Sequence, residues 1–271
     1  MPLARKGRRQ PSLVDAALDQ ALELGGCPLC SLQDRACAGY FRALVWELVT
    51  DVGARNKLRA SLGLCPRHWW RLRQLERDHL HNALGLAILL EDTVGEVRKL
   101  LEEGDFRRRW ENRAPCPACE REQQTEATYA GRLQERLETE PNLRRRLCKD
   151  HHNLHVPAPG RSLQRSGKLL PIPRGDPSRC PGCGAYEPSE RGKGPLPRCI
   201  PHLVEEAEPG VLEETARQAS VRWAEELQTH LRGFIHNQDY QVCEPLTVRE
   251  RTILDEAVFF LAGAPRVQSV P

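Results

Sequence analysis

The motif Cys27-Pro28-Leu29-Cys30 is followed, 35 residues after its second cysteine, by Cys65-Pro66-Arg67-His68. Both patterns, C-P-x-C and then C-x-x-H, occur twice more. The further copies are Cys116-Pro117-Ala118-Cys119 with Cys148-Lys149-Asp150-His151, and Cys180-Pro181-Gly182-Cys183 with Cys199-Ile200-Pro201-His202. These six motifs contain nine of the eleven cysteines in the chain. Most cysteines are therefore expected to act in groups rather than singly.

The spacing within each motif is typical of metal ligands. Two cysteines separated by two residues can turn both sulfurs towards one point, and a proline after the first cysteine suits the first position of a helix. The C-x-x-H motif adds a third sulfur and an imidazole, which together complete a closed tetrahedral site of the structural zinc type. The sequence therefore predicts up to three structural zinc ions. Their predicted ligands are Cys27, Cys30, Cys65, His68, Cys116, Cys119, Cys148, His151, Cys180, Cys183, Cys199 and His202.

Several features of these sites stay open at this level. Consecutive motifs form the simplest pairs, but half-sites could also be crossed between segments, and another thiophilic metal could replace zinc. His152 is an alternative to His151. Occupancy of the third site stays open because its surroundings are rich in proline and glycine. Cys37 lies on an apolar helix face and is expected to be a small buried residue. The remaining residues of these types are not expected to be ligands: Cys243, His79, His81, His155, His230 and His236.

The periodicity of apolar residues predicts an all-α fold, a helical scaffold that carries three zinc-knuckle-like sites. Helices are expected over residues 12–24, 31–50, 54–62, 66–103, 211–236 and 248–262, with a bend or interruption at 78–82. Ser12 with Asp15, and Thr247 with Glu250, have the spacing of helix-capping boxes. Gly85 indicates that a neighbouring helix approaches closely. Tyr129, Leu133 and Leu137 follow Cys119 at the distances at which Tyr40, Leu44 and Leu48 follow Cys30, which indicates an internal repeat.

The motifs divide the chain into six predicted segments. Residues 1–26 form an N-terminal tail and helix, 27–104 the first helical unit with its C-x-x-C and C-x-x-H motifs, and 105–156 the second. A linker rich in proline and glycine follows at 157–178, then a third zinc knuckle at 179–204 and C-terminal helices at 205–271.

The formal net charge of +3 does not indicate a nucleic-acid partner. Three thiolates and one Zn²⁺ leave a site at −1, so three loaded sites would bring the protein close to neutral. Arg67, Lys149 and Arg198 lie inside or beside the C-x-x-H motifs and are expected to offset this local charge. Trp69 and Trp70 among arginines could form a face that binds nucleic acid. We favour the alternative, in which Trp69 packs inward and the arginines face solvent.

The motifs of common enzymes are missing from the sequence, which contains no glycine-rich phosphate loop and no nucleophile motif. The longest apolar run, residues 84–90, is too short to span a bilayer, and no apolar core of a signal peptide follows the basic first ten residues. We therefore expect a cytoplasmic, non-enzymatic interaction module with structural zinc and a protein partner, with no membrane association and no small-molecule substrate. The alternatives are a nucleic-acid-binding protein and a thiol-based redox or metal sensor.

The first motifs also resemble a known group of sequences. The residues that carry the likeness are Cys27-Pro28-Leu29-Cys30, the segment 40–48, Leu64-Cys65-Pro66-Arg67-His68 and the run L-G-L-A-I-L-L-E-D at 84–92. In these residues, and in Glu244-Pro245 with the segment 257–263, the chain resembles an uncharacterised bacterial family of cysteine-rich helical proteins with a domain of unknown function. The resemblance covers most of 27–104 and 240–263 and implies no particular activity. The Trp69-Trp70 pair and the less apolar second helix depart from it.

Overall fold

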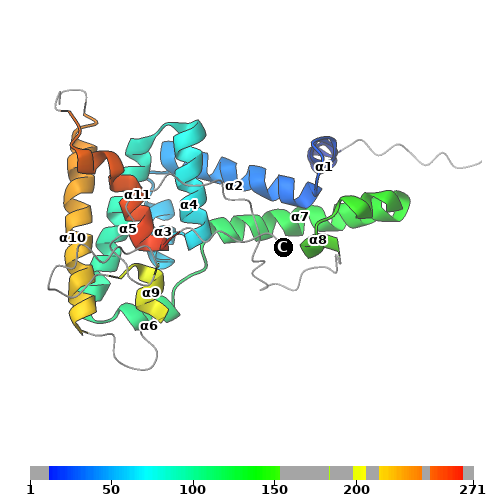
Figure 1. Cartoon of the computed structure of the whole chain (residues 1–271). Helices are drawn as coiled ribbons and strands as arrows, with labels where there is room; N and C mark the ends of the chain where they lie inside the picture. Colours follow the sequence, from blue (N-terminus) through cyan, green and yellow to red (C-terminus); the bar gives the residue numbers. More distant parts are fainter. Residues whose placement is uncertain (1–11, 153–182, 184–197, 206–213, 240–244, 265–271) are drawn as a thin grey trace, which may run out of the picture. The chain divides into compact units, whose positions relative to one another are not determined.

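The computed structural model of the chain describes residues 12–152, 183, 198–205, 214–239 and 245–264 (Figure 1). Regular structure in these ranges is helical throughout, without a strand, which confirms the all-α prediction. The predicted linker at 157–178, together with His155, Cys180 and Cys243, lies outside the described residues. Within them, no helix combines the length and the apolar character needed to cross a bilayer.

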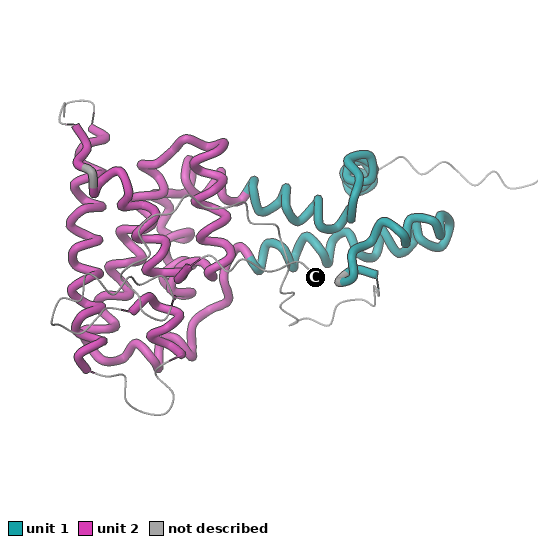
Figure 2. The backbone as a smooth tube through the Cα atoms, viewed as in Figure 1, with its two compact units in different colours: residues 1–39, 119–165 teal, residues 40–118, 166–271 magenta. Residues whose placement is uncertain are grey.

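The chain divides into two compact units, and neither is continuous in sequence (Figure 2). Unit 1 comprises Met1–Gly39 and Cys119–Arg165, and unit 2 comprises Tyr40–Ala118 and Ser166–Pro271. The boundaries fall inside α2 (Pro28–Trp46) and just after the start of α7 (Pro117–Thr139).

Unit 1 contains α1 (Leu13–Glu23), the first part of α2, most of α7, the 3₁₀ turn η2 (Pro141–Arg146) and α8 (Lys149–His152). Its core is small. The buried residues that form it are Leu18, Ala21, Leu29, Leu32, Leu133, Leu137 and Leu147.

An ion pair joins α1 to α7 in unit 1. Ser12 and Asp15 form the predicted capping box at the start of α1. Arg132 on α7 donates to both carboxylate oxygens of Asp15, at 2.7 and 3.0 Å. The hydrogen bond from Arg132, and then that from Ser12, holds the pKa of Asp15 far below its usual range. Asp15 therefore serves both as a helix cap and as the anchor of α1 on α7.

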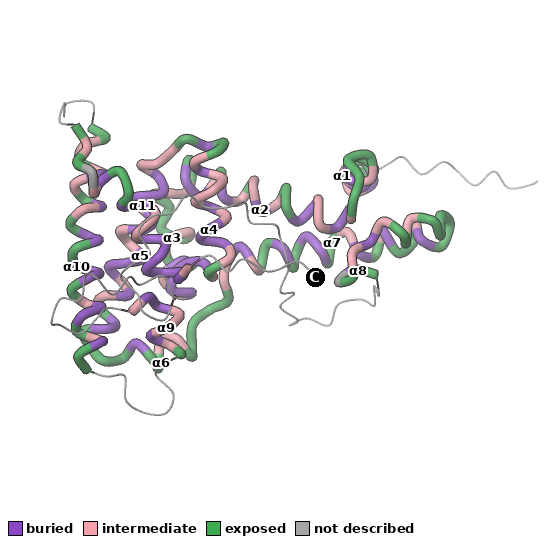
Figure 3. The backbone as a smooth tube through the Cα atoms, in the orientation of Figure 1, coloured by how far each residue is buried: buried purple, intermediate pink, exposed green. Residues whose placement is uncertain are grey.

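Unit 2 is built around α5 (Ala83–Glu103), along which buried positions recur (Figure 3). Helices α10 (Glu214–His236), α11 (Val248–Ala262) and α3 (Val52–Ala60) all pack on α5. Helix α4 (Pro66–Leu75) packs on α11, as does the short α9 (Ile200–Glu205), and α6 (Phe106–Glu111) follows α5. Thr247 and Glu250 form the capping box predicted for α11.

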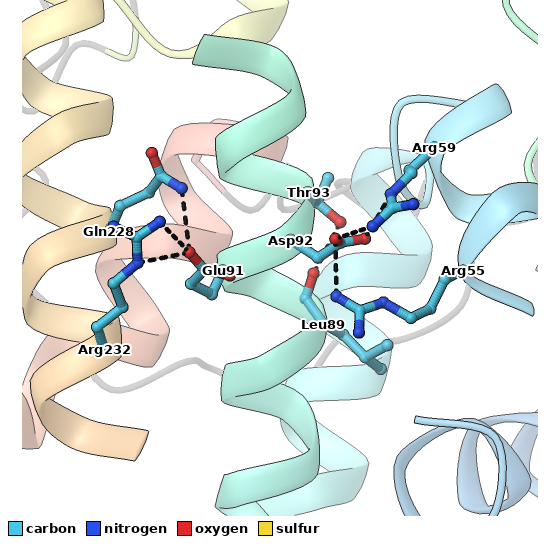
Figure 4. Close-up of polar contacts among 8 residues, drawn as sticks. All are labelled: Arg55, Arg59, Leu89, Glu91, Asp92, Thr93, Gln228 and Arg232. Carbon is cyan, nitrogen blue, oxygen red and sulfur yellow. Dashed lines mark hydrogen bonds and ion pairs between the residues drawn. The ribbon is translucent and has the colours of Figure 1, made fainter. Parts of the chain in front are cut away.

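Two adjacent carboxylates on α5 bond to different neighbours (Figure 4). Asp92 accepts from Arg55 at 2.7 Å and from Arg59 at 2.5 Å, both on α3. Glu91 accepts from Gln228 at 3.1 Å and Arg232 at 2.9 Å, both on α10. Burial acts to raise the pKa of Asp92, but the hydrogen bonds from Arg59 and Arg55 outweigh it and lower that pKa. These bonds orient α5 between α3 and α10.

The polar segment after α4 interrupts the helix, as the sequence predicts. A π-helical turn, η1 (Glu76–Leu80), ends at His81, whose φ of 49° lies in the left-handed region. Asn82 then caps α5, because its Oδ1 accepts from the backbone N–H of Gly85 at 3.1 Å. The Nδ2 group of Asn82 donates to the carbonyl of Val45 at 2.8 Å, which fixes the start of α5 against α2.

Gly85 lies at the closest approach of α5 to α2, as predicted. A Cβ atom at Gly85 would lie 2.1 Å from the carbonyl oxygen of Val45. Because both atoms belong to backbone or are fixed to it, no side-chain rotation could relieve this overlap.

We expect Gly85→Ala to lower the free energy of unfolding of unit 2 by about 1–3 kcal/mol, the usual cost of overpacking. All five tryptophans lie in unit 2, so tryptophan fluorescence during urea unfolding reports on this unit. The control is Gly131→Ala in α7, where the added Cβ would meet nothing within 4 Å. That control, followed by circular dichroism, should be neutral or stabilising by up to about 1 kcal/mol. A Gly85→Ala protein as stable as wild type would contradict the close approach.

Candidate metal centres

The first group of ligand atoms, which we name site 1, contains Cys27, Cys30, Cys148 and His151, all in unit 1. The Nδ1 atom of His151 lies 3.1 Å from the Sγ of Cys148, 3.3 Å from that of Cys27 and 3.6 Å from that of Cys30. The sulfurs of Cys30 and Cys148 are 3.5 Å apart. The imidazole of His151 is fully buried. Three sulfurs and one nitrogen thus face a common centre.

Site 2 consists of Cys65, His68, Cys116 and Cys119. In unit 2, the Nδ1 atom of buried His68 lies 3.2 Å from the Sγ of Cys65 and 3.5 Å from that of Cys116. Cys119, the first residue after the unit boundary, follows Cys116 by one helical turn, and the four ligand atoms lie within 4.8 Å of one another.

Site 3 has three members among the described residues: Cys183, Cys199 and His202. The Nδ1 atom of His202 lies 3.0 Å from the Sγ of Cys199 and 3.5 Å from that of Cys183, and the two sulfurs are 3.6 Å apart. The fourth predicted ligand, Cys180, falls outside the described residues.

These separations fit a tetrahedral ion. With Zn–S near 2.3 Å and Zn–N near 2.0–2.1 Å, tetrahedral angles place two sulfurs about 3.8 Å apart and a sulfur and a nitrogen about 3.6 Å apart. The observed ranges are 3.5–3.6 Å and 3.0–3.6 Å, slightly tighter than this geometry requires. None of the nine cysteines in the described part of the chain forms a disulfide. The donor set suits a thiophilic metal in all three groups.

Helix starts position the ligands. Pro28, Pro117 and Pro66 are the first residues of α2, α7 and α4, so Cys27, Cys116 and Cys65 immediately precede a helix. Cys148 and Cys199 likewise precede α8 and α9. In these five motifs the second ligand then lies on the first helical turn, where unbonded backbone N–H groups favour negative charge.

The electrostatic environment of site 1 favours a thiolate. The hydrogen bond from Cys30 lowers the pKa of Cys27 to about 3, against the opposing effect of burial, and His151 contributes in the same direction. A thiolate is the form of cysteine that binds metal, so this site is prepared for a cation.

The pairing of consecutive motifs holds for Cys183 with Cys199 and His202, but the first four motifs take the crossed alternative. The first C-P-x-C motif meets the fourth motif, C-K-D-H, rather than the second. The reason lies in the two cores. Leu29 and Leu32 of α2 pack with Leu147, which precedes Cys148, in the core of unit 1. The second motif, on α4, belongs instead to unit 2, where the ring of Phe41 lies 5.9 Å from that of His68.

The segment before Cys116 is held beside the second motif by local contacts in unit 2. The backbone N–H of Ala114 donates to the carbonyl of Ala60 at 2.9 Å. The guanidinium of Arg113 stacks on Trp110 at 3.8 Å from the ring centroid. Burial lowers the pKa of Arg113, while the charge of the Cys65 thiolate opposes that effect. Arg113 is therefore a cation near site 2 that the sequence reasoning missed, because it lies outside the C-x-x-H motifs.

The C-terminal end of α11 contacts site 3. The backbone N–H of Ala264 donates to the Sγ of Cys183 at 3.4 Å. Gly263 has a φ of 70°, and a Cβ atom added to it would lie 3.4 Å from the Sγ of Cys199. Its carbonyl accepts from the indole N–H of Trp70 at 2.9 Å. No motif in the sequence indicates these contacts, because the residues are more than 60 positions from the cysteines they touch.

Trp69 and Trp70 are buried, with 1% and 5% of their surface exposed. The inward packing that we favoured for Trp69 is thus confirmed, and neither indole presents a stacking surface for bases. The expectation that the neighbouring arginines face solvent is wrong for Arg73, whose side chain is 12% exposed and bound to Asp255 at 2.8 Å and to Glu76. Cys37 is fully buried, as expected. In site 1 it is His151, rather than the alternative His152, that faces the sulfurs.

Comparison with family models, with curated proteins and with solved structures finds no match to this chain.

Paired cysteine substitutions distinguish the crossed arrangement from the consecutive one. We expect the double substitution Cys27→Ser, Cys148→Ser to abolish the binding of one metal ion per chain, because both residues belong to site 1. Cys27→Ser with Cys65→Ser should abolish two. Consecutive pairing requires the opposite result. The measurement is metal content per chain by mass spectrometry of the purified protein.

Gly263→Ala should weaken site 3 selectively. The left-handed, extended backbone of Gly263 (φ 70°, ψ −173°) is nearly restricted to glycine, so alanine would cost about 1–3 kcal/mol unless the turn moved away from the sulfurs. We expect faster loss of one metal ion to a chelator. Gly104→Ala is the matched control, because φ is 75° there but no atom lies within 4 Å of the added Cβ. Equal metal retention in the two variants would contradict the role of Gly263.

Proposed function

We propose that this chain is a zinc-binding helical protein whose zinc ions are structural. The observation that carries the proposal is that sites 1 and 2 each gather three thiols and one buried imidazole Nδ1 within 4.8 Å. This is a common ligand set of structural zinc, and four protein ligands leave no coordination position for a substrate. Zinc bound there would contribute folding free energy directly, because the ligands come together only in the folded chain.

We further propose that the protein acts as a non-enzymatic interaction module in the cytoplasm, with a protein partner. The closed sites support a scaffold role over catalysis. Large apolar side chains at the surface are available for contact: Leu13, Leu24, Trp46 and Val52 are each more than half exposed. With each loaded site at −1, the protein would also be close to neutral overall, which favours a partner recognised by shape and apolar contact.

A thiol-based redox or metal sensor is the second candidate, and the environment of Cys27 favours it. This thiol has a pKa of about 3 and is only partly buried. Hydrogen peroxide could take two electrons from a pair of site 1 thiolates, which would form one disulfide and release the metal, while the peroxide and two protons become two water molecules. Nucleic-acid binding is less favoured, because Trp69 and Trp70 are both buried. The features that still support it are the basic clusters at 107–109 and 144–146.

The decisive measurement is the metal content of protein purified without added metal or chelator. We expect two to three zinc ions per chain, and fewer than two would overturn the proposal. Treatment with about one equivalent of peroxide per site then separates the candidates. A structural scaffold should retain its zinc and its helical content, whereas a sensor should release zinc and recover it after reduction.

Partner binding is tested by cross-linking in cells that produce either the wild-type chain or the Cys27→Ser, Cys65→Ser variant. An interaction module should cross-link a defined protein only when sites 1 and 2 are intact. Identical cross-links from both chains would contradict the zinc-dependent module. A fluorescence-anisotropy titration with oligonucleotides provides the third arm. In this titration we expect the Arg144→Ala, Arg145→Ala variant to give the same anisotropy as wild type. Salt-dependent binding that the variant weakens is expected only of a nucleic-acid-binding protein.

A further inference from the structure

The far side of the His151 ring faces a buried carboxylate. While Nδ1 of His151 lies among the sulfurs of site 1, its Nε2 is 3.7 Å from Oε1 of Glu126 on α7. Glu126 is 8% exposed and His151 is 0% exposed, so the two groups face each other away from bulk water. At this distance the pair is within ion-pair range but longer than a normal hydrogen bond.

Glu126 is itself held in place. Its Oε2 accepts from the Nε2 of Gln33 on α2 at 3.0 Å, and the same Gln33 amide donates to the carbonyl of Glu122 at 3.2 Å. Gln33 is also buried. The carboxylate therefore has one oxygen fixed by an amide and the other directed at the imidazole. Burying such a group is costly unless it is paired, so this arrangement requires a reason.

A metal on Nδ1 supplies that reason. An imidazole that gives its Nδ1 lone pair to a cation keeps its proton on Nε2, and that N–H needs an acceptor. Histidine ligands of metals commonly donate this second N–H to a carboxylate, which fixes the tautomer and the ring orientation and makes the nitrogen ligand more basic. Glu126 is the acidic acceptor in unit 1 that the structure places against Nε2.

We propose that Glu126 is a positioning residue for the zinc of site 1: it accepts the Nε2 proton of His151 in a hydrogen bond and, with Gln33, determines how firmly that site holds its metal. The inference rests on the proposed zinc function and adds a residue outside the four ligands. The position is specific to α7. Glu126 comes seven residues after Cys119, whereas the residue seven after Cys30 is Cys37, which has no carboxylate.

A carboxylate at site 3 provides a matched control. There the Nε2 of His202 is 3.8 Å from the Oε2 of Glu205, but the Glu205 side chain is 56% exposed. Water can replace an exposed acceptor with little loss, so the same substitution should matter much less at Glu205 than at Glu126.

The test measures zinc transfer from the full, zinc-loaded chain to the chromogenic chelator 4-(2-pyridylazo)resorcinol. We expect Glu126→Ala to speed the release of one zinc ion by about 10- to 100-fold, the usual effect of removing such a partner. Glu126→Gln should be intermediate, because its amide oxygen can still accept the proton. Glu205→Gln should release all its zinc at the wild-type rate.

Two further measurements separate positioning from general stability. In a Cys27→Ser background, which removes site 1, Glu126→Gln should leave the release of the remaining zinc unchanged. By ¹⁵N-resolved NMR, the Nε2 proton of His151 should exchange with solvent faster in Glu126→Gln than in wild type. The isosteric Gln variant keeps the test valid if the Ala variant fails to fold.

The inference is overturned, and the proposed function left intact, if the wild-type protein holds two or more zinc ions and both Glu126→Gln and Glu126→Ala release them at the wild-type rate. Accelerated release from every site would also overturn it, because that result indicates loss of the fold. Wild-type protein with fewer than two zinc ions would instead refute the proposed function, and the inference with it.

Discussion

The convergence of three sulfurs on the Nδ1 atom of His151 is the contact on which unit 1 depends. It joins residues 27–30 to residues 148–151, two segments that are far apart in the chain and that belong to the two separate stretches of this unit. Seven buried residues form the core that supports them. Because closing so long a loop costs entropy and this core is small, a shared metal is the interaction best able to hold the stretches together.

Unit 2 is held together by more extensive packing between helices. Helix α5 packs on several other helices, including α3, α10 and α11, and its carboxylates Glu91 and Asp92 bond to α10 and α3. The run at 84–92, which carries the resemblance to cysteine-rich helical proteins, can now be understood physically. Gly85 allows the backbone of α2 to approach, the buried leucines fill the core, and Asp92 anchors two arginines. These contacts join α5 to α2, α3 and α10, so they belong to the helical scaffold.

The three sites differ in what surrounds them. Site 1 has a buried carboxylate behind its histidine, site 2 has the partly buried cation Arg113 near Cys65, and site 3 is contacted by the turn after α11. A thiolate-rich site gains from a nearby cation or N–H donor, and a histidine ligand gains from a carboxylate that accepts its second N–H, so these different surroundings should give the metal ions unequal strength. A chain with unequal sites could lose one metal ion and keep the others.

The sequence by itself determined the helical class, the ligand residues that come together, the capping boxes at Ser12 and Thr247, the interruption before Asn82 and the close approach at Gly85. All of these follow from local rules: periodicity, cap spacing and the chemistry of C-x-x-C and C-x-x-H. Only the tertiary structure decided which half-sites meet, that Trp70 is buried as well as Trp69, and that Glu126, Arg113 and Gly263 lie beside the sites. Identical motifs carry no information about their partners, because the pairing is set by which leucines share a core, and those contacts join residues more than 100 positions apart.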